Sequence, residues 1–317
     1  MVSDAVVTDQ IVPFMIDHGA FRGRLVRLDD TVSTIVSRHN YPEPVALMLA
    51  ETAVLAVVLA DSLKYDGIFT LQSRSDGPIS QMVVDVTSGG DVRGVAHFDE
   101  ARLNAAVEKA GGIAALGDRV PALMGSGYLA FTVDQGPETD RYQGITELTG
   151  ATLADCAHAY FRQSEQLETA IKMATTHADG RWRAAGLMLQ RMPLPSGAQL
   201  SADDEEMVED AWRTGVVLMG SVTNEELLAP DLPPADVLRR LFHSEGLKAY
   251  DARHPHFGCR CSRERVVTAL SQFPRAELET MKTDAGVVEV SCEFCNEHYP
   301  FTDADLDAMD ADKAPKQ

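Results

Sequence analysis

The sequence predicts an α+β protein: a mixed α/β-sheet N-terminal domain, a helical middle region, and a small C-terminal module with four cysteines. Strand-like segments cluster between residues 21 and 193 without regular alternation with helices, which favours α+β over a doubly wound fold. The composition then shifts to proline, glycine, serine and acidic residues at 193–206. Two close cysteine pairs follow near the C-terminus.

The first elements are a strand and a long helix. Residues 21–29 alternate polar and apolar side chains, as a half-buried strand does. Residues 42–63 are expected to form an apolar helix. Glu51 and Thr52 interrupt its apolar run, which favours a buried helix over a membrane span of about 20 apolar residues.

Further strands are expected on both sides of a helix. Three strand-like segments between residues 67 and 99 are separated by the turn clusters RSDGP and SGGD. Residues 100–110 are expected to be helical, and residues 127–136 and 141–149 should form another strand pair.

The segment 150–176 is expected to form a helix. Thr152 can cap it with Asp155 at the third position, which resembles a capping box. The helix should lie against a sheet, because one face carries Leu153, Cys156, Ala157, Tyr160 and Phe161. A further strand at 181–193 would complete the N-terminal domain.

The predicted domains span 1–195, 196–255 and 256–302, and an acidic tail at 303–317 is expected to fray. The middle region is acidic and helical, with a second helix that opens at the prolines of PPADVLRRLF. It has too few apolar residues for a large core, so it should pack weakly on the first domain. Its apolar stripe at helical spacing consists of Met207, Val208, Ala211, Trp212, Val216 and Met219.

The net charge and the N-terminal segment indicate which partners and which cellular location to expect. The 48 acidic and 28 basic side chains give a net charge of −20, which argues against nucleic acid as a partner. The first residues lack a basic region followed by an apolar one, so we expect a cytoplasmic protein without a membrane partner. In the reducing cytosol, closely spaced cysteines favour metal binding or redox chemistry over structural disulfides.

Four cysteines carry the strongest functional signal. Cys259 and Cys261 are one residue apart, Cys292 and Cys295 are two apart, and 30 residues separate the pairs. Four thiolates meet the tetrahedral preference of zinc, so the pattern predicts one Zn²⁺ per chain. Asn296 tolerates the left-handed backbone that a zinc knuckle needs after its second cysteine. The residues between the pairs can supply two helices and a strand.

Other interpretations of these residues stay open. The C-x-x-C pair could be a thioredoxin-type redox centre, although the residues that follow its first cysteine make a poor helix. His254, His256 and His298 could replace a cysteine ligand, but four cysteines already fill the shell. Cys156 could be a fifth redox thiol, while its place on an apolar helix face favours a buried small hydrophobic residue.

The small size of the four-cysteine module makes its folding dependent on zinc. A domain this small usually needs a metal or disulfides to fold, and zinc contributes on the order of 10–16 kcal/mol in comparable peptides. Disulfides within each cysteine pair would close very short loops that constrain the unfolded chain little and are readily reduced. Oxidation within both pairs would remove all four zinc ligands. The spacing therefore favours a thiol switch whose output is unfolding.

Catalytic motifs do not compete with this interpretation. The sequence has no P-loop, no G-x-S-x-G and no H-E-x-x-H, so we expect no enzymatic activity. Two hypotheses from other classes remain beside the switch: a thiol-disulfide oxidoreductase that uses the C-x-x-C pair, and a binding module with static structural zinc.

Six segments carry a resemblance to a known family: LQSRSDGPISQMVVDVTSGGDVRG, DRYQGITELTG, YFRQSEQLET, AAGLMLQRMP, CRCSRERV and CEFCNEHYPF. Through them the chain resembles, over most of its length, the bacterial redox-regulated holdase chaperones, the thirty-three-kilodalton heat-shock protein family. The four-cysteine pattern is the most specific part of the resemblance. The acidic tail and the details of the middle region depart from the family.

The resemblance implies an inactive reduced monomer in which Cys259, Cys261, Cys292 and Cys295 bind zinc. Oxidants would form the disulfides Cys259–Cys261 and Cys292–Cys295, release zinc, and unfold the module and the middle region. The activated form would be a homodimer in the cytoplasm that binds unfolding client proteins without ATP, under oxidative stress and heat shock. The apolar stripe of the middle region fits this implication as a client-binding surface, because it is flanked by acidic residues and its methionines can adapt to varied partners. The residues of this surface are Met207, Val208, Trp212, Val216 and Met219.

Overall fold

The structure is a computed structural model, and it describes residues 9–17, 20–116, 119–136, 139, 141–165, 167–193 and 201–313. The chain divides into two compact units, Met1–Phe257 and Gly258–Gln317. The helices of the predicted middle region belong to the first unit, and the four clustered cysteines belong to the second.

The first unit contains two sheets. Sheet A has the order β10-β1-β2-β9-β8, and every neighbouring pair in it is antiparallel. Its strands are β1 (Gln10–Ile16), β2 (Phe21–Leu28), β8 (Thr169–Ala178), β9 (Arg181–Arg191) and β10 (Lys248–Ala249). Sheet B has the order β11-β5-β4-β3-β6-β7, with β11 parallel to β5. Its strands are β3 (Ile68–Ser75), β4 (Ile79–Thr87), β5 (Asp91–Phe98), β6 (Gly127–Asp134), β7 (Tyr142–Glu147) and β11 (His256–Phe257).

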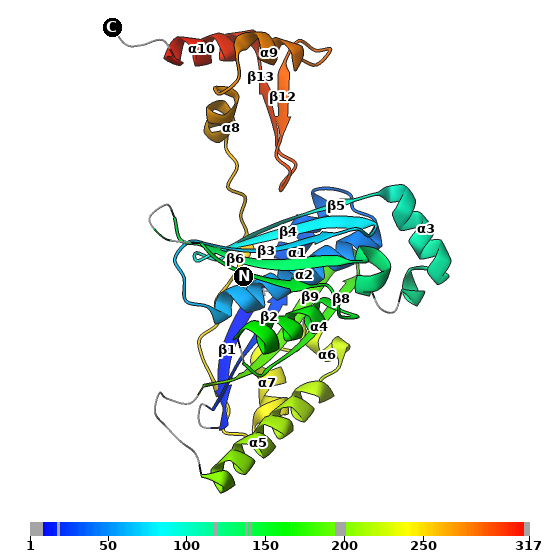
Figure 1. Ribbon diagram of the computed structural model, residues 1–317, viewed down its shortest axis with the longest axis vertical. Helices are drawn as coiled ribbons and strands as arrows, with labels where there is room; N and C mark the ends of the chain where they lie inside the picture. Colours follow the sequence, from blue (N-terminus) through cyan, green and yellow to red (C-terminus); the bar gives the residue numbers. More distant parts are fainter. Residues whose placement is uncertain are drawn as a thin grey trace, which may run out of the picture. The chain divides into compact units, whose positions relative to one another are not determined.

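A buried helical layer separates the two sheets. Helices α1 (Asp30–Ser37) and α2 (Glu43–Ser62) lie between sheets A and B (Figure 1). Helix α2 is long and apolar enough to cross a membrane, but its residues from Pro44 to Ala60 are buried inside the fold. It is therefore the central helix of the core. Helix α4 (Leu153–Tyr160) packs beside it, and α3 (Glu100–Ala110) ends at Gly111 with a left-handed φ of 85°.

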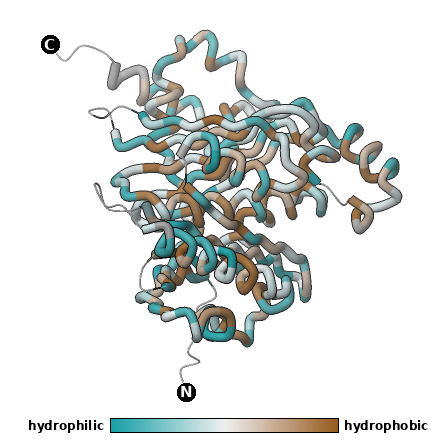
Figure 2. The backbone as a smooth tube through the Cα atoms, turned by 60° about the horizontal axis from the view of Figure 1, so that its bottom comes forward, coloured by the Kyte–Doolittle hydropathy of each residue, from teal (hydrophilic) through white to brown (hydrophobic). Residues whose placement is uncertain are grey.

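A second set of helices covers the other face of sheet A. These are α5 (Ala202–Ser221), α6 (Asn224–Leu228) and α7 (Pro234–Phe242), which we call the helical cover. Because successive strand residues point to opposite faces, β1 turns Val12, Phe14 and Ile16 toward the cover. Figure 2 shows hydrophobic and hydrophilic residues interspersed along the backbone, as expected for elements that each bury one face.

The glycine at position 23 allows the Phe14 side chain to pack closely against β2. A Cβ atom at Gly23 would lie 2.1 Å from Cζ of Phe14 and 2.7 Å from the carbonyl oxygen of Met188. The absent side chain lets the Phe14 ring lie across β2. That ring stacks on Phe242 of α7 with a centroid separation of 5.5 Å.

The second unit is a β-hairpin with three helices. Strands β12 (Val288–Ser291) and β13 (His298–Phe301) pair antiparallel, and the helices are α8 (Arg263–Leu270), α9 (Arg275–Thr280) and α10 (Asp303–Lys313). Its buried apolar core consists of Leu270, Leu278, Val288, Phe301, Leu306 and Met309.

The α+β prediction is confirmed, as are the helix at 42–63 and the capping box of Thr152 and Asp155. The continuous helix at 150–176 is wrong, because Thr169–Ala178 forms strand β8 instead. Its β-branched residues pair with β9 along the whole strand, and this tertiary pairing decides the local structure. The predicted boundary at 193–206 falls partly outside the described residues.

The expected fraying of the acidic tail is also wrong for Asp303–Lys313, which forms helix α10. Leu306 and Met309, three residues apart, lie on one face and enter the core of the second unit. Thr302 and Asp305 bond to one another at the start of the helix. Apolar packing and a cap therefore order a segment whose composition indicates a free tail.

Candidate metal centre

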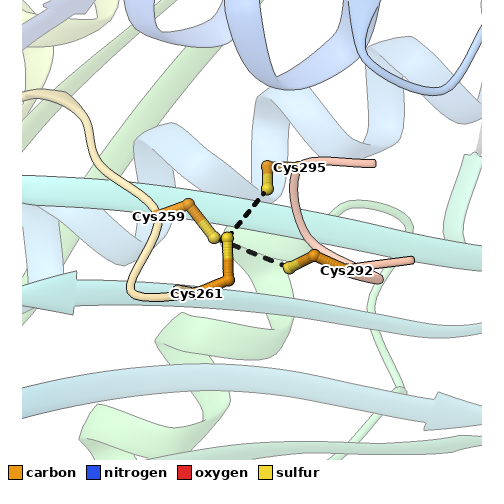
Figure 3. Close-up of side chains that lie close together, drawn as sticks. All are labelled: Cys259, Cys261, Cys292 and Cys295. Carbon is orange, nitrogen blue, oxygen red and sulfur yellow. Dashed lines mark hydrogen bonds between the residues drawn. The ribbon is translucent and has the colours of Figure 1, made fainter. Parts of the chain in front are cut away.

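Two segments of the second unit bring four sulfur atoms together. Cys259 and Cys261 lie in the extended residues directly before α8, and Ser262 caps that helix. Cys292 and Cys295 lie in the turn between β12 and β13. The hairpin register places this turn, because Ser291 pairs with His298 across it. Figure 3 shows the four side chains pointing toward one another from the two segments.

The turn that holds the second pair has the backbone of a metal knuckle. The Asn296 N–H donates to the Cys292 carbonyl at 2.8 Å, and the Cys292 N–H donates to the Glu297 carbonyl at 2.9 Å. Asn296 has a left-handed φ of 56°, as the sequence predicts. Because no helix begins at Cys292, the turn lacks the feature on which a thioredoxin-type centre depends.

The sulfur separations fit a tetrahedral metal ion. All four Sγ atoms lie within 4.8 Å of one another. Cys259 Sγ is 3.7 Å from Cys292 Sγ, and Cys261 Sγ is 3.3 Å from Cys295 Sγ. Ligands at about 2.3 Å around a tetrahedral zinc would be about 3.8 Å apart. All five cysteines of the chain are free thiols, so this is the arrangement of the reduced form.

Burial and hydrogen bonding shift the pKa values of the cysteine thiols. Burial opposes ionisation of Cys259, but hydrogen bonds from the Cys261 backbone and the neighbouring thiols outweigh it and lower its pKa to about 7. Burial raises the pKa of Cys261, and the Tyr299 hydroxyl acts in the opposite direction. Burial, with the neighbouring sulfurs, also raises the pKa of Cys295. Four adjacent thiolates repel one another, so a bound cation would supply the charge that lets all four ionise.

The histidines near the motif lie elsewhere. Within the described part of the chain, the cluster of possible metal ligands contains the four cysteines and no histidine. The His298 ring contacts Ser291 and Glu289, His254 contacts the Asp9 carbonyl, and His256 pairs with Asp91. Cys156 is fully buried on the apolar face of α4, and burial raises its pKa, so it is the buried hydrophobic residue that its helix position favours.

Known proteins resemble this chain over nearly its whole length. The family model described as Hsp33 protein matches residues 9–302. The chain belongs to the Hsp33 family. The 33 kDa chaperonin of Caulobacter vibrioides is 36% identical over 298 residues, which cover 93% of this chain and 95% of the relative. The 33 kDa chaperonin of Pseudomonas fluorescens is 37% identical over 306 residues, which cover 96% of this chain and 94% of the relative. The 33 kDa chaperonin of Escherichia coli is 35% identical over 299 residues, which cover 94% of this chain and 94% of the relative.

A solved structure has the same fold. The crystal structure of the Hsp33 homologue from Thermotoga maritima matches with a TM-score of 0.78 and 22% identity, and the match covers 96% of this chain and 99% of that one. The relatives are named chaperonins, so membership of the Hsp33 family indicates a chaperone and suggests a protein that is not an enzyme.

In this member of the Hsp33 family, most of the predicted client-binding stripe faces sheet A. Trp212 and Met219 of α5 are buried, and Val208 and Val216 are half-buried. The Trp212 ring lies 5.5 Å from that of Phe21. Met207, at the N-terminal end of the stripe, is in contrast 70% exposed. The stripe is therefore mainly a packing surface in the reduced form.

A buried arginine fastens the cover to sheet A and was not predicted from the sequence. Arg27 of β2 donates to four backbone carbonyls, those of Glu226 at 2.8 Å, Leu227 at 2.6 Å, Ala229 at 2.7 Å and Leu232 at 2.5 Å. Burial lowers its pKa to about 10. The sequence gives one indication of this role: Arg27 is a basic residue on the face of β2 whose other side chains are apolar and point toward the cover.

An extended strap, residues 248–257, follows the cover and runs along both sheets. The Arg253 and Ile11 backbones exchange two hydrogen bonds, and the His256 N–H donates to Gly90. The Arg253 guanidinium also pairs with the buried Asp61 carboxylate at 2.8 Å. The strap ends one residue before the second unit, and Cys259 follows two residues after its end.

Proposed function

We propose that this protein is an oxidation-activated, ATP-independent holdase chaperone. In the reduced state, Cys259, Cys261, Cys292 and Cys295 would hold one Zn²⁺ and the protein would be an inactive monomer. The observation that carries the proposal is the convergence of four free thiols within 4.8 Å in a chain of the Hsp33 family. Zinc would supply the positive charge that keeps the four sulfurs together as thiolates.

The fold of the second unit supports dependence on the metal. Its core contains six buried apolar side chains among the described residues, which is a small core for an independent fold. The cysteines link the segment before α8 to the hairpin turn. Loss of zinc would therefore remove the metal link between these two segments and leave only a small core and a few polar contacts to hold them, so the unit would unfold.

Oxidation would remove the ligands in pairs. We propose the two disulfides that the family resemblance implies, Cys259–Cys261 and Cys292–Cys295. In each pair, two thiolates lose two electrons to one hydrogen peroxide, which takes up two protons from solvent and becomes two water molecules, and one S–S bond forms. The two sulfurs of each disulfide are no longer thiolates, so the zinc ion loses two ligands with each bond that forms.

The strap provides a covalent route from this event to the helical cover. Once the second unit unfolds, the chain after Phe257 no longer ends in an ordered domain. The strap is held by backbone hydrogen bonds and by side-chain contacts, among them the ion pair of Arg253 with Asp61 and the contacts of His254 with the Asp9 carbonyl and of His256 with Asp91. Its loosening would free the chain that follows α7 and weaken the docking of the cover.

Release of the cover would expose a broad apolar surface. Sheet A would present the side chains Val12, Phe14, Ile16, Phe21, Leu25, Leu187 and Leu189. The cover would present Val208, Trp212, Val216 and Met219, beside the already exposed Met207. Contiguous apolar surface binds other apolar chains without directional contacts, which suits unfolding proteins of varied sequence. We further propose that the activated form is a homodimer and acts in the cytoplasm, where reducing conditions keep the thiols free.

The test is an aggregation assay with a heat-denatured client, run with zinc-loaded reduced protein and with peroxide-treated protein. We expect suppression of aggregation by the oxidised form alone, accompanied by zinc release. Equal suppression by both forms would contradict the switch. Reduction of insulin disulfides would favour an oxidoreductase, and retention of zinc after oxidation would favour a static zinc module.

A further inference from the structure

The hydroxyl group of Tyr299 lies against one of the four sulfurs. It donates a hydrogen bond to Cys261 Sγ at 3.2 Å. Tyr299 follows the second cysteine pair in the sequence, whereas Cys261 belongs to the first pair. The contact therefore crosses between the two segments that carry the cysteines.

The hairpin fixes the position of this hydroxyl. Tyr299 lies in β13 and pairs with Val290 of β12, and the neighbouring pair joins His298 to Ser291. Its half-buried ring packs against the apolar core of the second unit. Because backbone pairing and ring packing both restrain the side chain, the hydroxyl is held beside Cys261 rather than rotating freely in solvent.

We propose that the Tyr299 hydroxyl is a positioning residue that slows oxidation of Cys261. A donated hydrogen bond occupies a lone pair of the sulfur and stabilises the thiolate in place, so that less electron density is available to attack an oxidant. This inference rests on the proposed redox function and assigns one residue that sets its threshold.

The retarded step is the attack of the Cys261 thiolate on hydrogen peroxide. An S–O bond forms, the O–O bond breaks, and the departing hydroxide takes a proton to become water, which leaves a sulfenic acid. The Cys259 thiolate then attacks the oxidised sulfur, and the second oxygen leaves as water after protonation. The hydrogen bond from Tyr299 must weaken before the first attack, so its free energy adds to the barrier.

The variant Tyr299→Phe removes only the hydroxyl oxygen and keeps the ring that packs in the core. Tyr250→Phe is a matched control in the first unit, because the Tyr250 hydroxyl donates to Met15 Sδ at the same 3.2 Å separation. Each full-length protein is loaded with zinc under reducing conditions. Limiting peroxide is then added with a chromogenic zinc chelator, and oxidation of Cys261 is followed by mass spectrometry.

We expect Tyr299→Phe to bind one zinc per chain and to lose it about two- to tenfold faster than the unmodified protein, the scale of one net hydrogen bond. Cys261 oxidation should accelerate by a similar factor, and Tyr250→Phe should match the unmodified protein. Unchanged rates would overturn the inference. Slower oxidation would also overturn it, because the hydroxyl would then act as a proton donor to the departing oxygen.

A third result would overturn the inference in another way. If Tyr299→Phe could not hold zinc under reducing conditions, the hydroxyl would be needed for metal binding rather than for resistance to oxidation. Failure of the proposed function itself is distinguishable, because the unmodified protein would then lack bound zinc or would keep it after peroxide treatment.

Discussion

The stacked pair of Phe14 and Phe242 offers a way to release the helical cover without an oxidant. Phe242 is fully buried between α7 and sheet A. Replacement of Phe242 by alanine removes the ring and leaves a cavity, which costs about 3–5 kcal/mol in a well-packed core. A domain is stabilised by only about 5–15 kcal/mol in total, so this loss is a large fraction of what holds the cover. We therefore expect reduced, zinc-loaded Phe242→Ala to suppress client aggregation.

The assay needs a control for general destabilisation. Phe69→Ala is matched, because Phe69 is equally buried but lies in β3, within the core between the two sheets. Limited proteolysis shows whether the cover is released, since α5–α7 would become accessible to cleavage. If Phe242→Ala exposes the cover to protease and the reduced protein still fails to suppress aggregation, release of the cover is not the activating event. Equal activation by Phe69→Ala would show that loss of stability anywhere in the first unit has the same effect.

Four further predictions concern the metal centre and the first unit. Cys292→Ser should lose zinc and unfold the second unit even under reducing conditions; metal analysis showing one zinc per chain would exclude the four-thiolate site. Cys156→Ala should leave zinc release by peroxide unchanged, because Cys156 lies fully buried on α4; a slower release would give this thiol a redox role. Arg27→Met should increase hydrogen exchange of the loop that contains Ala229, because several carbonyls lose a charged donor worth about 1.5–3 kcal/mol each; unchanged exchange would exclude Arg27 as a fastening residue. His158 accepts a hydrogen bond from the Ile171 N–H, and burial lowers its pKa, so its contribution to stability is present above about pH 6.5 and is lost as the pH falls through the lower folded-state pKa. The decrease in Tm between pH 7 and pH 5 should therefore be smaller in His158→Gln, and an equal decrease would contradict this assignment.

Local sequence patterns were sufficient for much of the fold. Strands β3, β4 and β5 follow from alternating side chains and intervening turns, and α2 follows from its long apolar run. Strand β8 was mistaken for helix because its structure depends on pairing with β9. Strands β10 and β11 contain two residues each, too few for any periodic signal, and they exist because β1 and β5 offer them partners.

The metal centre was largely predictable, and the contacts around it were not. The spacing of four cysteines identifies the ligands because few chemistries use that pattern. Tyr299 could not be identified in the same way, since the register of the β12–β13 hairpin decides which side chain reaches Cys261. Arg27 is a similar case, because its acceptors are carbonyls of a distant segment, which carry no side-chain signature.

Simultaneous measurement of zinc release and client protection tests the central claim most directly. Zinc-loaded reduced protein is treated with peroxide in the presence of a chromogenic zinc chelator, and samples taken through the reaction are added to a heat-denatured client while light scattering is recorded. The account predicts release of one zinc per chain, with suppression of aggregation appearing at the same time or later. Suppression that develops while all the zinc remains bound would contradict it.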